Sequence, residues 1–428
     1  MKTRLVLTLL ATLLAAPPTV ADPDVGMTRE TTADFTLTAA ATGAPSTLGL
    51  LAIANGQVGH LGDVTRYAYV VVQSWQRSVV QGVHARSRST SVLAYFEAAV
   101  AQQASCSSSA PPSYAAYDSS PVSYCWIRRY HPSWFLRDRS GRLLHFNDFP
   151  GLVALDIGNA SYRALWMHNV ISLAKTGAFN GVYFDDVSLW PTHGLAGRIA
   201  KYTDTQYSQA MAGFAAYAGD SLRASGLRAV ANTGVDPWVG VQAQRAIAIA
   251  GHLTAVSQEH WVRWGNYCTS SPGVPFTSPY SSGNPDLATM LNFRRQLQHA
   301  GARVFGIDYS APNLSNSDYS AMVYGRSLFL MAWDGRPGSA YFFRTCGTSD
   351  PASPLWTADP GQPTGAMRVD QSTWMRPFTK GMVLLNPSPS TTVMYVLPLL
   401  QTYKTQSGQT VSLVIRLAPH SAVILTRA

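Results

Sequence analysis

Carboxyl groups at the ends of short apolar segments are the side chains of this sequence that could carry out chemistry. Only 23 Asp and Glu occur among 428 residues, yet several directly follow apolar runs. Cleavage of a glycosidic bond needs two carboxyl groups. One acts as nucleophile or as base for water, and the other donates a proton to the leaving oxygen. We expect Asp185 to be the nucleophile and Glu259 to be the acid/base.

Polar and aromatic side chains near this pair are candidates for binding a substrate. Aromatic rings stack on the apolar faces of sugars, and polar groups bind sugar hydroxyls. The expected binding residues are Glu97, Asp156, Asp186, Trp190, Asn232, Trp238, His260, Trp261, Trp264 and Asp308. Structural roles compete with this interpretation, because a Trp can pack in a core and Asp186 can cap a helix. For Glu97, a simple charge at a helix start is the favoured alternative.

Other hydrolytic chemistries find little support in the sequence. No Gly-x-Ser-x-Gly elbow and no His-Glu-x-x-His motif occurs, and the ten His are dispersed. The sequence therefore predicts no bound metal and no organic cofactor.

Eight apolar runs between about residues 65 and 345 alternate with helix-like segments. The runs are Tyr67–Gln73, Ser91–Glu97, Leu152–Asp156, Gly181–Asp186, Leu227–Asn232, Leu253–Glu259, Ala302–Asp308 and Ser339–Phe343. Such alternation predicts a parallel sheet, and eight units match a (β/α)8 TIM barrel of about 250 residues. An open doubly wound sheet is the alternative, although no Gly-rich phosphate loop opens any of the helices.

The period of two residues along a strand predicts which side chains point into this barrel. Val182 and Phe184 share one face, which would pack outward on the helices. Gly181, Tyr183 and Asp185 then point inward, and the same period places Glu259 on the inward face of its strand. Catalytic groups of TIM barrels sit at the C-terminal ends of the strands, so the two carboxyl groups would meet at one rim.

The chain after about Trp374 has short strand-like runs separated by Pro, Ser and Gly, without helical patterns. We therefore predict three parts. Residues 1–21 are a signal peptide, residues 22–350 are the catalytic barrel, and residues 365–428 are a small antiparallel β-sandwich.

The N-terminus and the cysteines indicate an exported protein. Lys2 and Arg4 precede an apolar run of about 12 residues, which is shorter than the roughly 20 residues of a membrane span. The protein would therefore be secreted or periplasmic, without a membrane partner after cleavage. Four cysteines allow three disulfide pairings, of which we favour Cys106 with Cys125 and Cys268 with Cys346. The formal charge of +9 is scattered, which argues against a nucleic-acid partner.

Three segments resemble a known group of proteins. Trp134–Asp138, Leu155–Tyr162 and Phe179–Val187 are similar to the glycoside hydrolases called glycoside-hydrolase-like family fifteen. They are more distantly similar to the α-galactosidase and dextranase superfamily of TIM barrels. The turns at Asn386-Pro387-Ser388 and Leu417–Ala422 resemble the β domains that follow many α-glycosidase barrels.

The resemblance implies roles for the two carboxylates. The wider superfamily has an Asp nucleophile after strand 4 and an acid/base after strand 6. The spacing Phe179-x-Gly181-x-x-x-Asp185 places the nucleophile on Asp185, and strand order alone places the acid/base on Glu259. Asn180-Gly181 replaces the Asp-Gly that is common in the family, and an Asn can cap the same turn.

The sequence thus predicts a glycoside hydrolase that cleaves a polysaccharide or oligosaccharide, with a retaining mechanism favoured over an inverting one. A carbohydrate-binding protein on an inactive barrel and a transglycosylase with the same residues are the alternatives. The sequence determines neither the sugar nor the oligomeric state.

Overall fold

A computed structural model describes residues 49–53, 64–115, 118–147, 149–190, 194–235, 237, 239–259, 287–309, 316–344, 358–411 and 413–428. Trp238, His260, Trp261, Trp264, Cys268, Cys346 and the predicted signal peptide lie outside the described residues.

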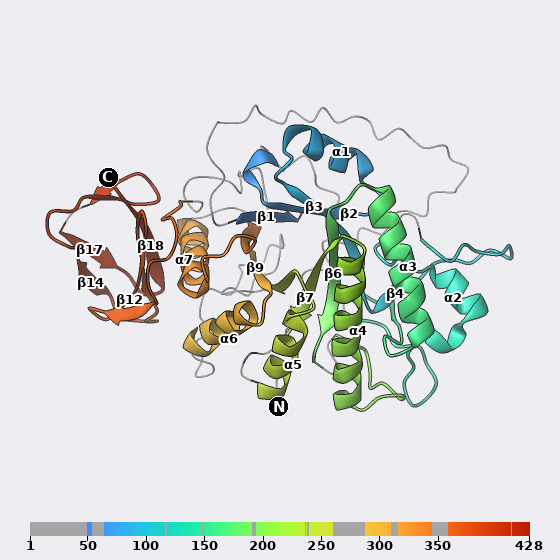
Figure 1. Cartoon of the computed structure of the whole chain (residues 1–428). Helices are drawn as coiled ribbons and strands as arrows, with labels where there is room; N and C mark the ends of the chain where they lie inside the picture. Colours follow the sequence, from blue (N-terminus) through green and yellow to red (C-terminus); the bar gives the residue numbers. More distant parts are fainter. Residues whose placement is uncertain are drawn as a thin grey trace.

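Eight of the described strands form one parallel sheet (Figure 1). They are β1 (Gly49–Ile53), β2 (Tyr69–Gln73), β3 (Ser91–Glu97), β6 (Gly181–Ser188), β7 (Arg228–Gly234), β8 (Ala255–Glu259), β9 (Arg303–Tyr309) and β10 (Ala340–Arg344). Their order is β1-β10-β9-β8-β7-β6-β3-β2, and β1 also pairs with β2, so the strands form a closed ring. The predicted α/β class with a parallel sheet is confirmed.

One predicted barrel strand is wrong. The run Leu152–Asp156 forms β5 (Leu152–Ala154), which pairs antiparallel with β4 (Val100–Gln102) in a separate two-stranded sheet. Strand β3 pairs directly with β6 instead, and the eighth strand of the ring is β1, which lies between β10 and β2 and which the sequence pattern did not predict. Because β1 comes first in the chain, β6 is still the fourth strand of the ring and β8 is still the sixth.

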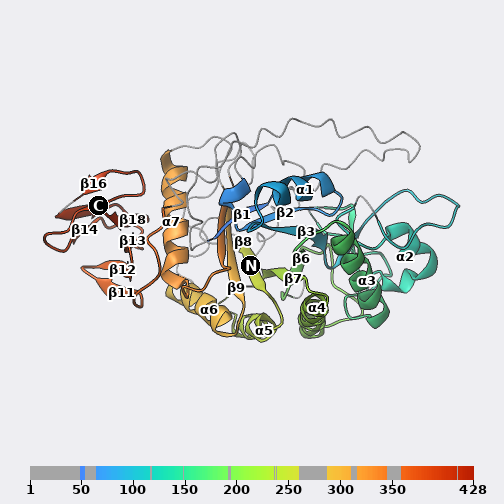
Figure 2. The ribbon, with the colours of Figure 1, turned by 45° about the horizontal axis from the view of Figure 1, so that its top comes forward.

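Helices lie on the outer side of this sheet (Figures 1 and 2). They are α1 (Arg77–Arg86), α2 (Tyr124–Tyr130), α3 (Ala160–Thr176), α4 (Asp204–Ala224), α5 (Gly240–Ala250), α6 (Leu287–His299) and α7 (Asn316–Ala332), with short 3₁₀ turns at Val64–Arg66 and Pro132–Trp134. Local sequence fixes several helix starts. Thr203 and Gln206 form a capping box at α4, and the Asn159 side chain accepts from two backbone amides at α3.

The predicted faces of β6 are confirmed by the packing. Val182 and Phe184 belong to the large core between strands and helices, and the Phe184 ring meets Trp166 of α3 edge to face. Tyr183 belongs instead to a second core, with side chains such as Tyr95, Val230 and Phe305 from other strands of the ring. The strand period therefore turns Tyr183 and Asp185 to the inside of the barrel.

The C-terminal part is antiparallel, as predicted. One sheet has the order β11 (Arg368–Asp370), β12 (Thr373–Phe378), β13 (Gly381–Asn386), β18 (Ser421–Arg427), β15 (Tyr403–Lys404) and β16 (Thr410–Val411), and a second pairs β14 (Val393–Val396) with β17 (Val414–Leu417). Strand β13 is buried on both faces. Val383 and Leu385 join the core of the barrel, whereas Met382 and Leu384 share a core with β14 and β17.

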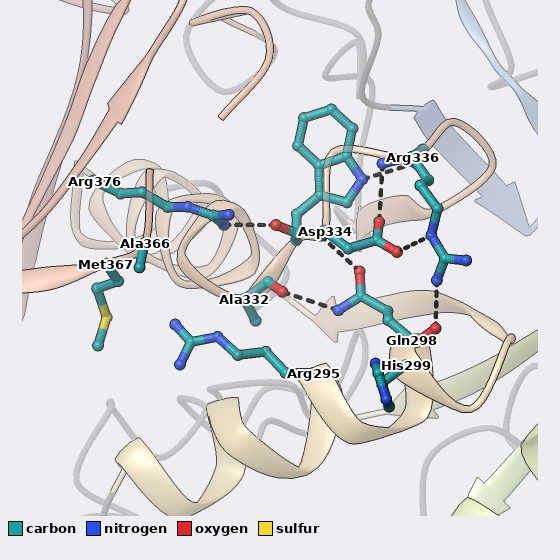
Figure 3. Close-up of a pocket in the computed structure, with 10 residues that line it drawn as sticks. Arg295, Gln298, His299, Ala332, Asp334, Arg336, Ala366, Met367 and Arg376 are labelled. Atoms are coloured by element: carbon teal, nitrogen blue, oxygen red, sulfur yellow. Dashed lines mark hydrogen bonds and ion pairs between the residues drawn. The ribbon is translucent and has the colours of Figure 1, made fainter. Parts of the chain in front are cut away.

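A pocket of about 380 Å³ lies where α6, α7 and the C-terminal part meet (Figure 3). Arg376 of β12 reaches into this junction and donates from Nη1 to the carbonyl oxygens of Leu330 and Trp333 at 2.6 Å. Arg376 therefore satisfies carbonyl groups at the C-terminus of α7 that the helix itself leaves without a donor.

The disulfide between Cys106 and Cys125 is present in the structure, which confirms one of the two predicted pairings.

Candidate active site

Four of the predicted residues gather at the C-terminal ends of neighbouring barrel strands. Glu97 ends β3, Asp185 lies on β6, Asn232 on β7 and Glu259 at the end of β8. Glu97 and Asp185 are direct partners in the pairing of β3 with β6. The parallel sheet thus brings together residues that are up to about 160 positions apart in the sequence.

Asn232 connects the two carboxylates expected to be catalytic. Its Nδ2 donates to Oδ1 of Asp185 at 2.7 Å and to Oε1 of Glu259 at 2.6 Å. The sum of these two distances sets an upper limit, so the two carboxylate oxygens are at most about 5.3 Å apart. Carboxyl groups of retaining glycosidases are about 5–5.5 Å apart and those of inverting enzymes about 6.5–9.5 Å.

The Asp185 carboxylate is buried and accepts several hydrogen bonds. The Tyr95 hydroxyl donates to Oδ2 at 2.5 Å, and the backbone N–H of Asp186 donates to Oδ1 at 2.8 Å. Burial raises the pKa of Asp185, while the hydrogen bonds from Tyr95, Asn232 and Asp186 act in the opposite direction because they stabilise the charged form. Such a carboxylate is fixed in orientation and has its charge balanced by donors.

Asp186 occupies a local irregularity of β6. The register between β6 and β7 shifts between Phe184 and Val187, and Asp186 has a φ of 56°, which a non-glycine residue seldom adopts. The bulge keeps Asp186 beside Asp185 instead of on the opposite face. Burial and then the charge of Asp185 raise the pKa of Asp186 to about 7.

Glu97 forms part of the same cluster and is fully buried. Burial, followed by the charges of Asp186 and Asp185, raises the pKa of Glu97 well above its ordinary value. The backbone of Glu97 is held by the indole of Trp166, which donates to the Glu97 carbonyl at 2.9 Å. The expectation of a simple charge at a helix start is wrong, because such a charge would lie in solvent.

Tyr95 lies between two carboxyl groups, and its hydroxyl has only one proton. The hydroxyl oxygen is 2.8 Å from Oε1 of Glu97 and 2.5 Å from Oδ2 of Asp185. The shorter of the two contacts is the one to Asp185, so the hydroxyl proton mainly serves that carboxylate. Asp185 already accepts from Asn232 and Asp186, which favours its charged form. Burial and the charges of Asp186 and Asp185 favour the protonated form of Glu97, and its hydrogen bond with Asp186 acts in the same direction.

Sequence reasoning missed Tyr95, and it gave Tyr183 an inward face without a role. The Tyr183 hydroxyl hydrogen-bonds with Oγ of Ser257 at 3.0 Å, below Asp185 and Glu259 on the same faces of β6 and β8. The spacing along the strand could have identified both tyrosines. Tyr95 precedes Glu97 by two residues, and Tyr183 precedes Asp185 by two, so each pair shares one face.

Asp156 does not end a barrel strand, which corrects the prediction. It lies after β5, and its buried carboxylate accepts from Nζ of Lys201 and from the hydroxyl of Tyr202, both at 2.5 Å. Gly158 fits against this group, since a Cβ there would lie 2.1 Å from the Tyr202 hydroxyl. Asp156 thus anchors the segment between β6 and α4 to the end of β5 in the two-stranded β4–β5 sheet.

Two further predicted binding residues lie within the described part of the chain. Asp308 on β9 is fully buried and accepts from the hydroxyl of Tyr341 on β10 at 2.9 Å. Trp190 follows β6 and is partly exposed, and Ser188 Oγ fixes its backbone by accepting from its N–H at 3.2 Å. Among the described residues, no group of His, Cys, Asp and Glu has an arrangement that could hold a metal ion.

The pocket of Figure 3 lies at the opposite end of the barrel strands from this cluster, because the residues that α6, the end of α7 and the following turn contribute to it precede the starts of β9 and β10. Polar side chains that line this pocket form hydrogen bonds and ion pairs with other residues of the protein. Gln298 donates to the Ala332 carbonyl at 2.9 Å, and Arg336 pairs with Asp334. The carboxylate cluster is therefore the candidate active site.

The solved structures that match this chain are remote in sequence. The glycoside hydrolase domain of PelA from Pseudomonas aeruginosa is 13% identical, with 70% of this chain and 96% of that chain covered and a TM-score of 0.45. The maltogenic α-amylase AmyB from Thermotoga neapolitana is 12% identical, with 89% and 96% covered and a TM-score of 0.47. The α-amylase from Geobacillus thermoleovorans, complexed with acarbose, is 10% identical, with 90% and 99% covered and a TM-score of 0.47.

No curated protein matches the chain. Residues 84–382, well over half of the chain, match the family described as hypothetical glycosyl hydrolase family 15. This span contains Glu97, Asp185, Asn232 and Glu259. The chain belongs to this family and is a glycoside hydrolase.

Proposed function

We propose that the protein cleaves glycosidic bonds of a polysaccharide or oligosaccharide by a retaining mechanism, with Asp185 as nucleophile and Glu259 as acid/base. The observation that carries this proposal is the shared donor Asn232, which limits the distance between the two carboxylate oxygens to about 5.3 Å. This upper limit on the two oxygens that share the donor lies below the roughly 6.5 Å at which the spacing of inverting enzymes begins, and it is compatible with the about 5–5.5 Å of retaining enzymes.

The proposed reaction has two steps. Asp185 Oδ attacks the anomeric carbon while protonated Glu259 gives its proton to the leaving oxygen, which forms a glycosyl ester on Asp185. Glu259, now charged, then takes a proton from water, whose oxygen attacks the anomeric carbon and releases Asp185. Tyr95, Asn232 and the Asp186 N–H hold Asp185 as an anion in the attacking orientation.

The surroundings of the pair support a carbohydrate as substrate. Asp186 is partly exposed next to Asp185, and Trp190 is partly exposed just after the end of β6; we propose that they bind sugar hydroxyls and a sugar face, respectively. Asn232 would keep its hydrogen bonds to Asp185 and Glu259 during catalysis. Roles for Asp308, Asp156, Trp238, His260, Trp261 and Trp264 in substrate binding remain expectations.

We further assign the closed parallel sheet to the (β/α)8 TIM-barrel class and the C-terminal part to the β-sandwich class. The strand order and the core that Met382 and Leu384 share with β14 and β17 support these assignments.

We also propose that the protein is exported from the cell after cleavage near residue 21, on the basis of the apolar N-terminal run.

The test is a comparison of isosteric variants on a panel of glycans. Asp185→Asn and Glu259→Gln should each lower kcat by about 10³-fold or more, because each removes a group that reacts in the transition state. Asp220→Asn is the matched control, since Asp220 is an exposed residue of α4 that pairs with Arg223 and His252. Near wild-type activity in either site variant would exclude the assignment.

The anomer of the first product distinguishes the mechanisms. NMR should detect the same anomeric configuration as in the substrate, and an inverted product would exclude a retaining reaction. Products longer than the substrate would indicate a transglycosylase with the same residues. Binding of glycans without any turnover, in a folded wild-type protein, would favour the alternative of a carbohydrate-binding protein.

A further inference from the structure

The C-terminal domain carries an exposed aliphatic surface that hydrolysis does not use. We define the distal patch by six exposed side chains: Met394, Val396, Leu399, Leu400, Leu413 and Val414. Leu399 is 76% exposed and Leu400 is fully exposed. Isolated exposed apolar residues are ordinary, but a continuous group of them indicates an interaction surface.

The pairing of β14 with β17 makes the distal patch continuous. Val396 lies opposite Val414, and both point away from the core that Tyr395 and Ile415 enter. Leu413 precedes Val414, and its carbonyl accepts from the N–H of Leu397 at 2.7 Å. This bond joins the Leu413 turn to the loop with Leu399 and Leu400. A solvated outer face would carry polar residues at these alternate positions.

The backbone holds two of these leucines in an unfavourable conformation. Leu400 has a φ of 66° and Leu413 a φ of 72°. Among the described residues with positive φ, they are the only large aliphatic ones. Gly or Asn would fit both positions with less strain. Strained positions persist where function requires them, and here the strain holds two leucine side chains in solvent.

The C-terminal part carries a net positive charge, and one of its cations, Arg416, lies in the outward face of the distal patch. Residues 358–428 contain six Lys and Arg, two Asp and no Glu. Asp359 pairs with Lys380, and Asp370 accepts from the Tyr395 hydroxyl. Arg416 is exposed directly opposite Met394 in the same outward face. Arg368 and Lys404 are exposed on β11 and β15 of the other sheet.

These properties select one kind of partner. A sugar would need aromatic rings for stacking, and the distal patch consists of aliphatic side chains only. A second copy of the chain, in a symmetric contact of this face, would bury Arg416 of both copies without an acidic partner among the residues of the distal patch. An anionic lipid surface satisfies both features, because leucines enter the boundary of the acyl chains while cations contact the headgroups.

We propose that the distal patch binds the surface of an anionic phospholipid bilayer and attaches the enzyme peripherally. This departs from the expectation that the protein has no membrane partner. No described helix is long and apolar enough to cross a bilayer, so the attachment is interfacial. Strands β14 and β17 lie on the side of the C-terminal domain away from α7 (Figures 1 and 2). The distal patch and the carboxylate cluster therefore lie in different parts of the molecule.

The experiment measures cosedimentation of the purified protein with vesicles. Wild-type protein should bind vesicles that contain phosphatidylglycerol, with weaker binding at high salt. The double variant Leu400→Asn and Leu413→Asn should bind at least about tenfold more weakly, because two aliphatic side chains leave the interface. Its Tm should stay equal or rise, since Asn tolerates positive φ. Arg416→Gln should weaken binding to the anionic vesicles.

Val241→Gln is the matched control, because Val241 is similarly exposed on α5 of the barrel, and it should bind like wild type. Three results would overturn the proposal. These are no binding of the wild type to anionic vesicles, undiminished binding of the double variant, and self-association that the double variant abolishes without any vesicle binding. Glycan hydrolysis in solution is not part of this test, so its outcome is independent of the proposed function.

Discussion

Asp185 and Glu259 accept hydrogen bonds from the same nitrogen atom, Nδ2 of Asn232. One amide group thereby fixes both the separation and the relative orientation of two carboxylates from different strands. Because the two hydrogens of an amide point in different directions, neither carboxylate competes with the other for this donor. Asn232 is a positioning residue in the proposed mechanism.

Replacement of Asn232 should impair the reaction more than the fold. We expect Asn232→Ala to lower kcat by about 10²-fold, as is typical for the loss of a preorganised donor in an active site, with a smaller change in KM. Asn169→Ala is the matched control. Asn169 donates to the Pro121 carbonyl at 2.9 Å away from the site, so this variant should lower Tm and leave kcat unchanged. Equal kcat in Asn232→Ala and wild type would contradict the positioning role.

Glu97 should act as a neutral acid. Glu97→Gln keeps a neutral polar group of the same shape beside Tyr95 and Asp186, so we expect kcat within about threefold of wild type. Glu97→Ala removes the partner of Tyr95 and leaves a cavity, and it should lower both kcat and Tm. Infrared difference spectra between wild type and Glu97→Gln should contain the band of a protonated carboxyl group. An inactive but folded Glu97→Gln protein would show that the charged form is needed.

Asp186 should make the stability depend on pH. Its pKa rises from 3.8 to about 7 in the folded protein, so the folded state binds a proton that the unfolded state releases near pH 4. The stabilisation by this proton is complete below about pH 4 and is lost as the pH rises through about 7. Tm should therefore fall between pH 5 and pH 8, and Asp186→Asn should make this fall smaller. The same slope in both proteins would contradict the shifted pKa of Asp186.

Arg376 should support the junction between barrel and C-terminal domain. Arg376→Met keeps much of the aliphatic volume but leaves the carbonyls of Leu330, Met331 and Trp333 without their donor. We expect the free energy of unfolding to fall by about 3 kcal/mol, with kcat retained at low temperature because the site lies at the other end of the strands. Arg368→Met, an exposed change on β11, is the control and should unfold like wild type. Denaturant titration measures both.

Local sequence determined much of the fold and the facing of the site residues. A strand period of two residues is a local property, and it correctly turned Tyr183 and Asp185 inward and Val182 and Phe184 outward. Seven of the eight predicted strands lie in the ring for the same reason. The chemistry of two carboxylates at strand ends was also evident from residue types alone.

Tertiary structure decided which strands form the ring, because pairing partners are distant in sequence. Leu152–Ala154 and Gly49–Ile53 are similar short apolar runs. The first pairs with Val100–Gln102 outside the ring, and the second pairs with Tyr69–Val71 and with Ala340–Tyr341 inside it. No periodic pattern within either run distinguishes these outcomes. Because Leu152–Ala154 pairs outside the ring, Asp156 does not lie at the barrel rim. It binds Lys201 and Tyr202 instead.

The charge state of the site also depended on tertiary structure. Glu97 is adjacent to a predicted helix in sequence, where a solvent-exposed charge is the ordinary outcome. In the folded chain it is buried against Tyr95 and beside Asp185 and Asp186, where desolvation and like charges favour the neutral form. Sequence therefore determined which residues could react. Only the three-dimensional arrangement decided which of them carries a proton, because desolvation and charge proximity arise after the strands have come together.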